Sequence, residues 1–208
     1  MTDFFTADHH FYHTKILDYC QRPFASVEEM NESLIESWNS VVSEGDTVYH
    51  LGDFGLAGVG KLAAIKRRLN GSIVLIRGNH DTCSKTAYVE RLGFLDVLES
   101  MEYEVKNSDR KLYLCHYPAD NSGMYDDRFS DRRPIIPHGS WLIHGHVHTA
   151  WRIDKRQINI GVDVRNYRPL SLEEICAVID AHQGPKELAA PSPISARLIL
   201  NEIQSSAQ

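Results

Sequence analysis

Apolar residues recur at two different spacings along this chain, and each spacing predicts one kind of element. Over residues 26–42 they return every three or four positions, which predicts an amphipathic helix. Ser26 stands at its start and Glu29 follows three positions later, an arrangement typical of a capping box. The same criteria predict further helices over residues 60–70, 85–94 and 171–181. Ser171 is the expected cap of the last helix.

Short apolar runs between these helices predict strands. They cover residues 3–8, 46–54, 72–81, 101–108, 111–118, 141–146 and 151–162. The runs at 101–108 and 111–118 flank a turn, so they are expected to pair as antiparallel strands. Helices alternate with the first strands, whereas the later strands pair directly. This order indicates a layered α/β protein with mixed sheets.

Length and composition favour a single sizeable domain. The chain has 208 residues, of which 42% are hydrophobic and 24% are charged, as in ordinary globular proteins. Residues 183–208 differ because they contain three prolines and a polar end. We therefore expect a domain over residues 1–182 followed by a loosely attached C-terminal tail. The polar stretch 117–139 holds no predicted element and is either a functional loop or a solvated insertion.

Charge and cysteine content narrow the class of protein. The formal net charge of -6 argues against a dedicated nucleic-acid binder, whose surface is usually basic. The four cysteines lie far apart without a CxxC pair, so we expect reduced thiols with packing roles. No apolar stretch approaches the roughly 18 residues needed to cross a bilayer, and no signal-peptide pattern opens the chain. These features predict a cytoplasmic protein without membrane attachment.

Polar residues directly follow five of the predicted strands, often beside a glycine. In open α/β sheets the carboxyl ends of the strands form the crevice where ligands bind, so these residues are expected to converge on one site. Their side chains offer carboxylate, amide and imidazole groups and include no thiol. They are Asp8, His10, Asp53, Asn79, His116, His146 and His148.

This set of donors suits a divalent metal such as Mn²⁺, Fe²⁺ or Zn²⁺. Seven donors are too many for one four-coordinate ion, whereas two ions that share a bridging carboxylate fit the count. A single Asp before a glycine turn, or a single histidine, usually has a structural role. Here, however, polar residues follow five different strands in the same way. A structural role for the whole set is therefore not expected.

In their order and spacing, the five strand-end motifs resemble the calcineurin-like metallophosphoesterase superfamily. The motifs are DHH at 8–10, GD at 52–53, GNHD at 78–81, His116, and GHVH at 145–148. The resemblance extends over about residues 1–182. Residues 6–17 and 159–175 are more narrowly similar to the small bacterial and phage phosphoesterases of that superfamily.

This resemblance implies a four-layer αββα sandwich with two mixed β-sheets and a dinuclear metal centre at the strand ends. The first ion would be held by Asp8, His10 and His148. The second would be held by Asn79, His116 and His146, and Asp53 would bridge the two. Mn²⁺ is the expected metal, with Fe²⁺ and Zn²⁺ as alternatives.

The implied activity is hydrolysis of a phosphomonoester or phosphodiester by a metal-bridging hydroxide. Two ions about 3.5–4 Å apart can activate water and brace the attacking and leaving oxygens. His80 matches the family's catalytic histidine that binds no metal, and it is expected to act as general acid. Asp81 either orients His80 or is an ordinary turn residue. His144 has no ligand role in the family pattern, and we expect it to orient a ligand from behind.

Candidate substrate contacts are His13, Arg77 and Arg165, since guanidinium and imidazole groups bind phosphate. Ligand support, helix capping and surface ion pairing are the alternative roles for these three residues. The expected partner is a small phosphate ester, and nucleic acid is not favoured. A nuclease of the same superfamily and a metal-bound scaffold module without turnover are the competing functions. The intact His80 argues against the scaffold, which would need no histidine outside the ligand set.

Overall fold

A computed structural model describes residues 1–120 and 128–183 of the chain. The chain divides into two compact units, Met1–Leu172 and Glu173–Gln208, and the helix α4 (Leu172–Gln183) begins at their boundary. This division precedes the domain boundary expected after residue 182. Beyond Gln183 the expected tail lies outside the described residues, as do residues 121–127 of the polar stretch.

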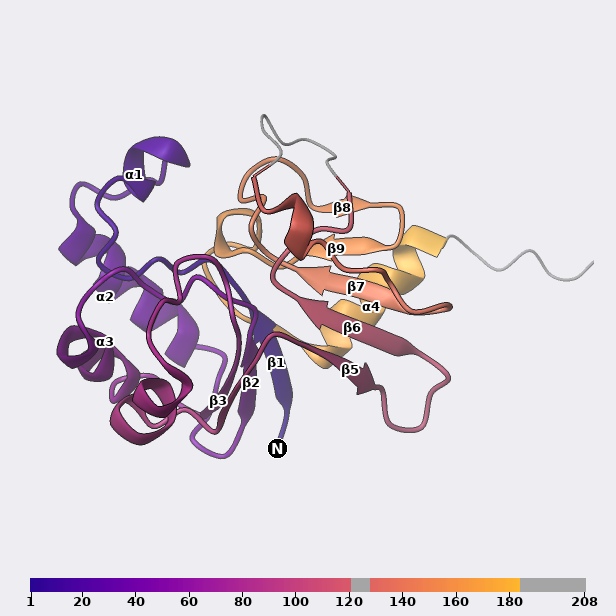
Figure 1. The fold of residues 1–208 in the computed structure, drawn as a ribbon, viewed down its shortest axis with the longest axis horizontal. Coiled ribbons are helices and arrows are strands. Elements are labelled where there is room, and N and C mark those ends of the chain that lie inside the picture. Colours follow the sequence, from indigo (N-terminus) through magenta and orange to yellow (C-terminus); the bar gives the residue numbers. More distant parts are fainter. Residues whose placement is uncertain (121–127, 184–208) are drawn as a thin grey trace, which may run out of the picture. The chain divides into compact units, whose positions relative to one another are not determined.

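The first sheet of the larger unit has the strand order β10-β1-β2-β3-β4. Four of its strands run parallel, namely β1 (Asp3–Thr6), β2 (Thr47–His50), β3 (Ser72–Ile76) and β4 (Asp96–Leu98). The short β10 (Leu170–Ser171) pairs antiparallel with β1. The carboxyl ends of β1, β2 and β3 therefore lie at one edge of the sheet (Figure 1).

The second sheet has the order β5-β6-β7-β9-β8. The strands β5 (Ser100–Glu104) and β6 (Lys111–Cys115) form the expected antiparallel pair. Next to them, β7 (Trp141–His144) runs parallel to both β6 and β9 (Gln157–Asn159). The edge strand β8 (Ile153–Asp154) is antiparallel to β9. Both sheets are thus mixed, as the sequence predicts.

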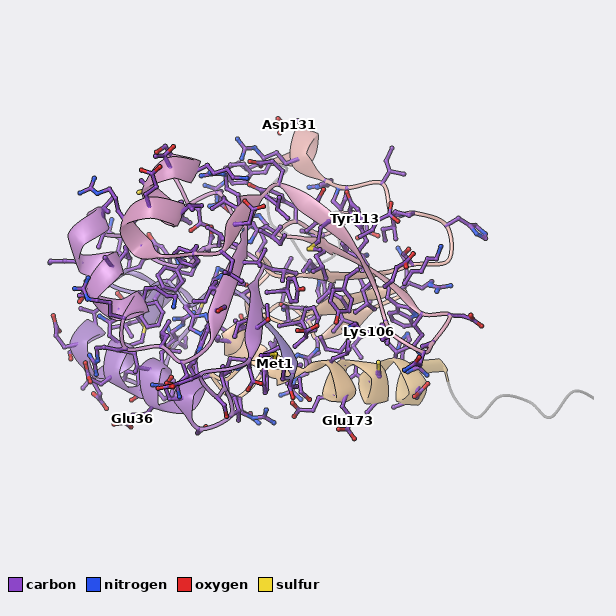
Figure 2. The ribbon with its side chains drawn as sticks, turned by 90° about the horizontal axis from the view of Figure 1, so that it is seen from below. Met1, Glu36, Lys106, Tyr113, Asp131 and Glu173 are labelled. Carbon is purple, nitrogen blue, oxygen red and sulfur yellow. The ribbon has the colours of Figure 1, made fainter. Side chains whose placement is uncertain are left out.

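Helices cover the first sheet on one side and enclose the main core with it. The helix α2 (Val27–Asn39) buries Met30, Leu34 and Trp38, while its exposed Glu36 points outward (Figure 2). The predicted cap is confirmed, because the Ser26 hydroxyl accepts a hydrogen bond from the Glu29 amide at 3.1 Å. The helix α3 (Val59–Lys66) adds Leu62 and Ile65 to the same core.

Aromatic rings join the two sheets face to face. The ring of Phe5 on β1 lies 5.3 Å from that of Tyr103 on β5, and Tyr49 on β2 lies at the same distance from Tyr103. The Tyr103 hydroxyl also donates to the Asp3 carboxylate at 2.5 Å. Two mixed five-stranded sheets with helices confirm the predicted α/β sandwich.

Two local predictions need correction, and one residue has an additional role. The single strand expected over 151–162 is a hairpin of β8 and β9, turned at Lys155, which has a φ of 52°. Ser171, the expected cap, directly precedes α4 and is also the last residue of β10. The helix expected over 85–94 is a shorter π-helical segment, Ala87–Leu92, ended by Gly93 in the left-handed conformation.

No helix within the described parts of the chain is long and apolar enough to cross a membrane.

Candidate metal centre

The residues that follow the strands have unusual backbone conformations. Asp8, His10, Asp53, His146 and His148 all have positive φ, between 46° and 71°. Residues other than glycine rarely adopt this region, because their Cβ then approaches the following carbonyl oxygen. Five such residues among the seven predicted donors indicate that the chain accepts backbone strain to direct these side chains.

Two glycines allow these strand ends to approach one another. A Cβ atom at Gly52, which has a φ of 91°, would lie 2.5 Å from Nδ1 of His116. A Cβ atom at Gly145 would lie 2.6 Å from Oδ2 of Asp8. The ends of β1 and β7 are also joined directly, because the Asp8 carboxylate accepts a hydrogen bond from the His146 amide at 2.9 Å.

The first donor group consists of Asp8, His10 and His148, each of which offers a ligand atom within 4.8 Å of the other two. Nε2 of His10 is buried and makes no hydrogen bond within the described residues. Burial, with a contribution from His148, holds the pKa of His10 well below its ordinary value. His10 therefore keeps a free lone pair in a buried position, which is what a metal ligand requires.

His148 is oriented by a buried ion pair that the sequence analysis did not identify. Nδ1 of His148 lies 2.8 Å from Oδ2 of Asp163, and Asp163 also accepts from the Arg22 guanidinium at 2.7 Å. Arg22 in turn donates to the carbonyl oxygens of His9 and Asp8, at 2.8 and 2.7 Å. With Nδ1 held in this way, Nε2 of His148 is the nitrogen left for an ion.

Burial alone would lower the pKa of His148. The Asp8 carboxylate and the hydrogen bond to Asp163 outweigh burial and raise this pKa well above its ordinary value.

Cys20 also lies beside this pair, since its sulfur belongs to a group of possible ligands with His148 and Asp163. The four cysteines were expected to have packing roles, and Cys20 is the one that the structure brings to the donor set.

The second donor group is centred on His116. Its Nδ1 lies 2.7 Å from the carbonyl oxygen of Leu51, so Nδ1 carries the proton and Nε2 is the free nitrogen. That Nε2 lies 3.3 Å from Oδ1 of Asn79 and 3.2 Å from Nδ1 of His146. Ligands about 2 Å from a common ion are separated by such distances.

Asp53 connects the two groups through one oxygen atom. Its Oδ2 lies 3.4 Å from Nε2 of His10 and 3.6 Å from Nε2 of His116. Its Oδ1 accepts from the His80 amide at 2.9 Å. Burial, followed by the nearby Asp81, raises the pKa of Asp53 to about 7. A buried carboxylate at this position would be stabilised by positive charge, so the donor set fits divalent ions.

Two further histidines, His13 and His80, face this donor set, and His80 also forms a group of possible ligands with His10 and Asp53. The half-buried His80 has its ring 5.1 Å from that of His10 and 5.6 Å from that of His13. Nδ1 of His13 lies 3.2 Å from Nδ1 of His10. The structure thus brings the predicted general acid and one predicted substrate contact, His13, to the cleft that the donors line.

Asp81 does not orient His80. Its buried carboxylate accepts hydrogen bonds from the backbone amides of Asp53, Phe54 and Gly78, at 2.7 to 3.1 Å. It also accepts from the Tyr88 hydroxyl at 3.1 Å. Asp81 therefore ties the loop after β3 to the loop after β2, which is the turn role and not the catalytic one.

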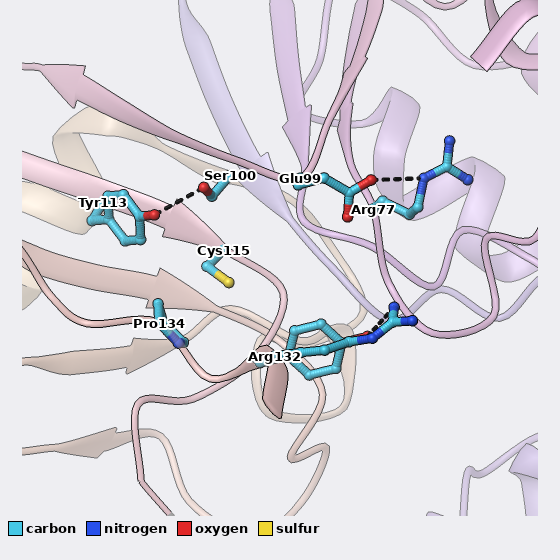
Figure 3. Close-up of a pocket in the computed structure, with 8 residues that line it drawn as sticks. Arg77, Glu99, Ser100, Tyr113, Cys115, Arg132 and Pro134 are labelled. Atoms are coloured by element: carbon cyan, nitrogen blue, oxygen red, sulfur yellow. Dashed lines mark hydrogen bonds and ion pairs between the residues drawn. The ribbon is translucent and has the colours of Figure 1, made fainter. Parts of the chain in front are cut away.

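The structure does not bring Arg77 to the donor set. Figure 3 shows Arg77 at a different pocket, of about 380 Å³, where its Nε pairs with Glu99 at 3.2 Å. Its Nη1 donates to the carbonyl oxygens of Asp81 and Cys83. The guanidinium thus braces the loop that carries His80, so the predicted phosphate contact is replaced by a structural role.

Arg165 is likewise directed elsewhere. It donates from Nε to the carbonyl oxygen of Asn159 at 2.8 Å and from Nη2 to that of Arg152 at 3.1 Å. Burial, with a contribution from Arg152, lowers the pKa of Arg165 to about 10. These contacts hold the chain after β9, and they correct the expectation that Arg165 grips phosphate.

His144 is also not a support for a ligand side chain. Its Nδ1 lies 2.7 Å from the carbonyl oxygen of Gly145, and its ring packs 4.8 Å from that of Trp151. Burial lowers the pKa of His144 to about 3. His144 was expected to orient a metal ligand. Its only contact of that kind is with the backbone carbonyl of Gly145, the residue before His146.

The cleft over the donor set includes residues that the sequence analysis did not assign to the site. Three of them are Tyr19, Arg128 and Phe129. Tyr19 ends the short helix α1 (Ile16–Tyr19), and the other two belong to the polar stretch 117–139. In the sequence, only the length and polarity of this stretch, which suggested a functional loop, pointed to Arg128 and Phe129 as residues of the site.

Comparisons with known proteins agree with this geometry. A sequence model of the calcineurin-like phosphoesterase superfamily domain matches residues 6–166. The uncharacterized protein MJ1445 of Methanocaldococcus jannaschii is 37% identical over 187 residues, which cover 84% of this chain and 89% of the relative. The Gene 66 protein of Mycobacterium phage L5 is 29% identical over 196 residues, covering 85% and 93%.

A solved structure is similar over the same region. The crystal structure of AQ665 from Aquifex aeolicus, a protein of unknown function, has a TM-score of 0.69 and 27% sequence identity, and the match covers 85% of this chain and 98% of that one. The family implies divalent metal ions, and the buried carboxylate and imidazole groups fit them. The chain therefore belongs to the calcineurin-like phosphoesterase superfamily, and it is in general terms a metal-dependent phosphoesterase.

Proposed function

We propose that this protein hydrolyses phosphomonoesters or phosphodiesters with two divalent metal ions. Mn²⁺ suits the donor set well, and Fe²⁺ and Zn²⁺ are the alternative metals. The observation that carries the proposal is the position of Asp53 Oδ2, within 3.4 and 3.6 Å of one histidine nitrogen from each donor group. A single carboxylate oxygen close to both sets of ligands can be shared by two neighbouring ions.

Asp8, His10 and His148 would hold one ion, and Asn79, His116 and His146 the other, with Asp53 between them. When bound, the ions supply a nucleophilic water and positive charge on the phosphoryl oxygens. Several histidines are already in the protonation state that binding needs. Burial and His116 lower the pKa of His146 to about 2, so its nitrogen is unprotonated at neutral pH.

His80 would complete the reaction. The attacking water gives up a proton to solvent and its oxygen forms a bond to phosphorus. The bond from phosphorus to the leaving oxygen breaks, and the departing alkoxide takes a proton from the protonated His80 imidazole. The amide of His80 donates to Asp53 Oδ1 at 2.9 Å, which fixes its backbone beside the shared carboxylate. His80 thus lies next to the ligands, and the two ions would each have their proposed donors without it.

A panel of phosphate esters tests this function. Purified protein loaded with Mn²⁺, Fe²⁺, Zn²⁺ or Mg²⁺ is assayed with monoesters and with linear and cyclic diesters. We expect hydrolysis of at least one class, and its loss in Asp53→Ala and His116→Ala. His138→Ala is the matched control, because His138 is exposed and outside the donor groups. Absence of hydrolysis across the panel by metal-loaded wild type would refute the proposed function.

A further inference from the structure

The cleft over the candidate metal centre is larger than a phosphate group needs. Its volume is about 520 Å³, which lies in the range of pockets for small organic ligands, roughly 300–1,000 Å³. Five of the seven donor residues line it, and so do Ile16, Tyr19, Arg128 and Phe129. The groups attached to phosphorus would therefore contact protein, and the side chains of these four residues decide which groups fit.

Tyr19 forms one side of this cleft. Its side chain is 69% exposed, although Ile16, three residues earlier on α1, is 2% exposed and anchors the helix. Five large apolar residues in the described part of the chain are exposed, and of these only Tyr19 lines the cleft. The ring of Tyr19 meets that of His13 edge-on, with 6.3 Å between the ring centres.

Phe129 lies beside the other donor group. Its ring centre is 5.6 Å from that of His146 and 5.8 Å from that of Tyr117. Its φ is 63°, a left-handed conformation that is unfavourable for a bulky residue. Strain of this kind occurs where a side chain must be placed for function. The backbone at Phe129 therefore places an aromatic ring where a more relaxed loop would not.

The two rings contact different histidines of the cleft. Tyr19 contacts His13, and His13 lies 5.6 Å from His80, the proposed general acid. Since the acid must reach the leaving oxygen, the leaving alcohol lies on the Tyr19 side. Phe129 contacts His146, a proposed ligand of the second ion. A ring beside this ligand can contact the ester group that stays on phosphorus in a diester, whereas a monoester has no such group.

We propose, building on the proposed function, that the substrate is a small phosphodiester with a planar ring on each side of phosphorus, as in a short nucleotide diester. Tyr19 packs against the ring of the leaving alcohol, and Phe129 packs against the ring of the retained ester group. A stack of this kind changes kcat/KM by about 5- to 150-fold. The net charge of -6 favours a small diester over a long polyanion.

Two diesters with the same leaving group separate the two roles. Bis(4-nitrophenyl) phosphate carries a ring on both sides, whereas methyl 4-nitrophenyl phosphate carries one on the leaving side alone. For Phe129→Ala we expect a loss of kcat/KM with the first substrate that exceeds the loss with the second by at least about fivefold. Tyr19→Ala should lower kcat/KM for both substrates by a similar factor, and Tyr19→Phe should restore most of that loss.

Matched controls keep the result interpretable. Leu95→Ala removes an apolar side chain that is 59% exposed outside the cleft. The bound metal and melting temperature of each variant are measured, so that a folding defect is not read as a substrate effect. Equal losses with both substrates in Phe129→Ala, or unchanged kcat/KM in both alanine variants, would overturn this inference while the proposed function stands. If wild type cleaves neither diester but cleaves monoesters, the inference is likewise overturned.

Discussion

The Asp163 carboxylate hydrogen-bonds Nδ1 of His148 at 2.8 Å, although 15 residues separate them in the chain. The same oxygen accepts from Nη2 of Arg22 at 3.0 Å, and both side chains of this Arg22–Asp163 pair are almost fully buried. The pair fixes the imidazole so that Nε2 faces the first donor group. Because Arg22 also binds the carbonyl oxygens of Asp8 and His9, one guanidinium holds two parts of the candidate metal centre together.

Asp163→Asn should weaken the first metal site selectively. The asparagine oxygen can still accept from Nδ1 of His148, but it removes the negative charge that increases the basicity of the imidazole. We expect the affinity for one of two Mn²⁺ ions to fall by about 10- to 100-fold, with little change for the other. Titration calorimetry of metal-free protein measures both affinities.

The control for that experiment is Asp109→Asn, an exposed carboxylate in the hairpin between β5 and β6. It changes the net charge equally and should leave both affinities as in wild type. Unchanged affinities in Asp163→Asn, or an equal decrease at both sites, would contradict the role given to Asp163.

Arg22→Lys should destabilise the fold strongly although it keeps the charge. Lysine cannot reproduce the planar fork that binds Asp163 and two carbonyl oxygens at once. Breaking a buried ion pair costs about 3–5 kcal/mol of unfolding free energy. Because the lysine can keep one charge–charge contact with Asp163, we expect a loss near the lower end of this range. Urea unfolding measures the free energy of unfolding.

Arg68→Lys is the matched control for this variant. Arg68 pairs with Glu32 at the surface, with side-chain exposures of 48% and 55%. Such exposed pairs contribute about 1 kcal/mol or less, so we expect a small effect. Comparable losses in the two variants would show that the Arg22 network contributes no more than a surface pair.

Much of the donor set could be predicted from sequence because it depends on local patterns. A buried strand that ends in Gly-Asp or Gly-Asn places its polar residue at the carboxyl end, whatever the rest of the fold. Asp53 and Asn79 follow β2 and β3 in this way, and His116 follows β6 directly. Parallel neighbours in each sheet then bring these ends together.

Side-chain direction could not be predicted in the same way. Arg77 lies one residue from the GNHD motif, but its long side chain turns toward Glu99 and the carbonyl oxygen of Cys83. Arg22 and Asp163 are 141 residues apart, and no local spacing connects them. The position of Phe129 depends on a left-handed backbone in an irregular loop, for which an apolar pattern gives no signal.

The acid sensitivity of the fold should depend on His144. Its folded pKa of about 3 lies below the unfolded value of 6.5, so the unfolded chain binds more protons below pH 6.5. This contribution to stability is complete above pH 6.5 and is lost as pH falls toward 3. In His144→Leu, the decrease in unfolding free energy between pH 6.5 and 5 should be smaller than in wild type by about 2 kcal/mol.

Unfolding with urea at the two pH values, in the presence of a chelator, measures this difference. The exposed His138 provides the control, because His138→Leu should leave the pH dependence as in wild type. The comparison uses the change between pH values, so a constant destabilisation by the leucine does not affect it. If the unfolding free energy of His144→Leu and of wild type decreased equally between pH 6.5 and 5, a neutral, buried His144 would not be the cause of the acid sensitivity.

The most direct test of the proposed two-metal phosphoesterase compares wild type and His80→Ala with two Mn²⁺ ions bound to each chain. Both are assayed with diphenyl phosphate, whose leaving group needs a proton, and with bis(4-nitrophenyl) phosphate, whose leaving group needs it less. We predict a loss of at least about 100-fold in His80→Ala with diphenyl phosphate and a smaller loss with the other ester. Equal losses with both esters would contradict His80 as the acid, and failure of the two-metal wild type to hydrolyse these diesters and phosphate monoesters alike would contradict the account as a whole.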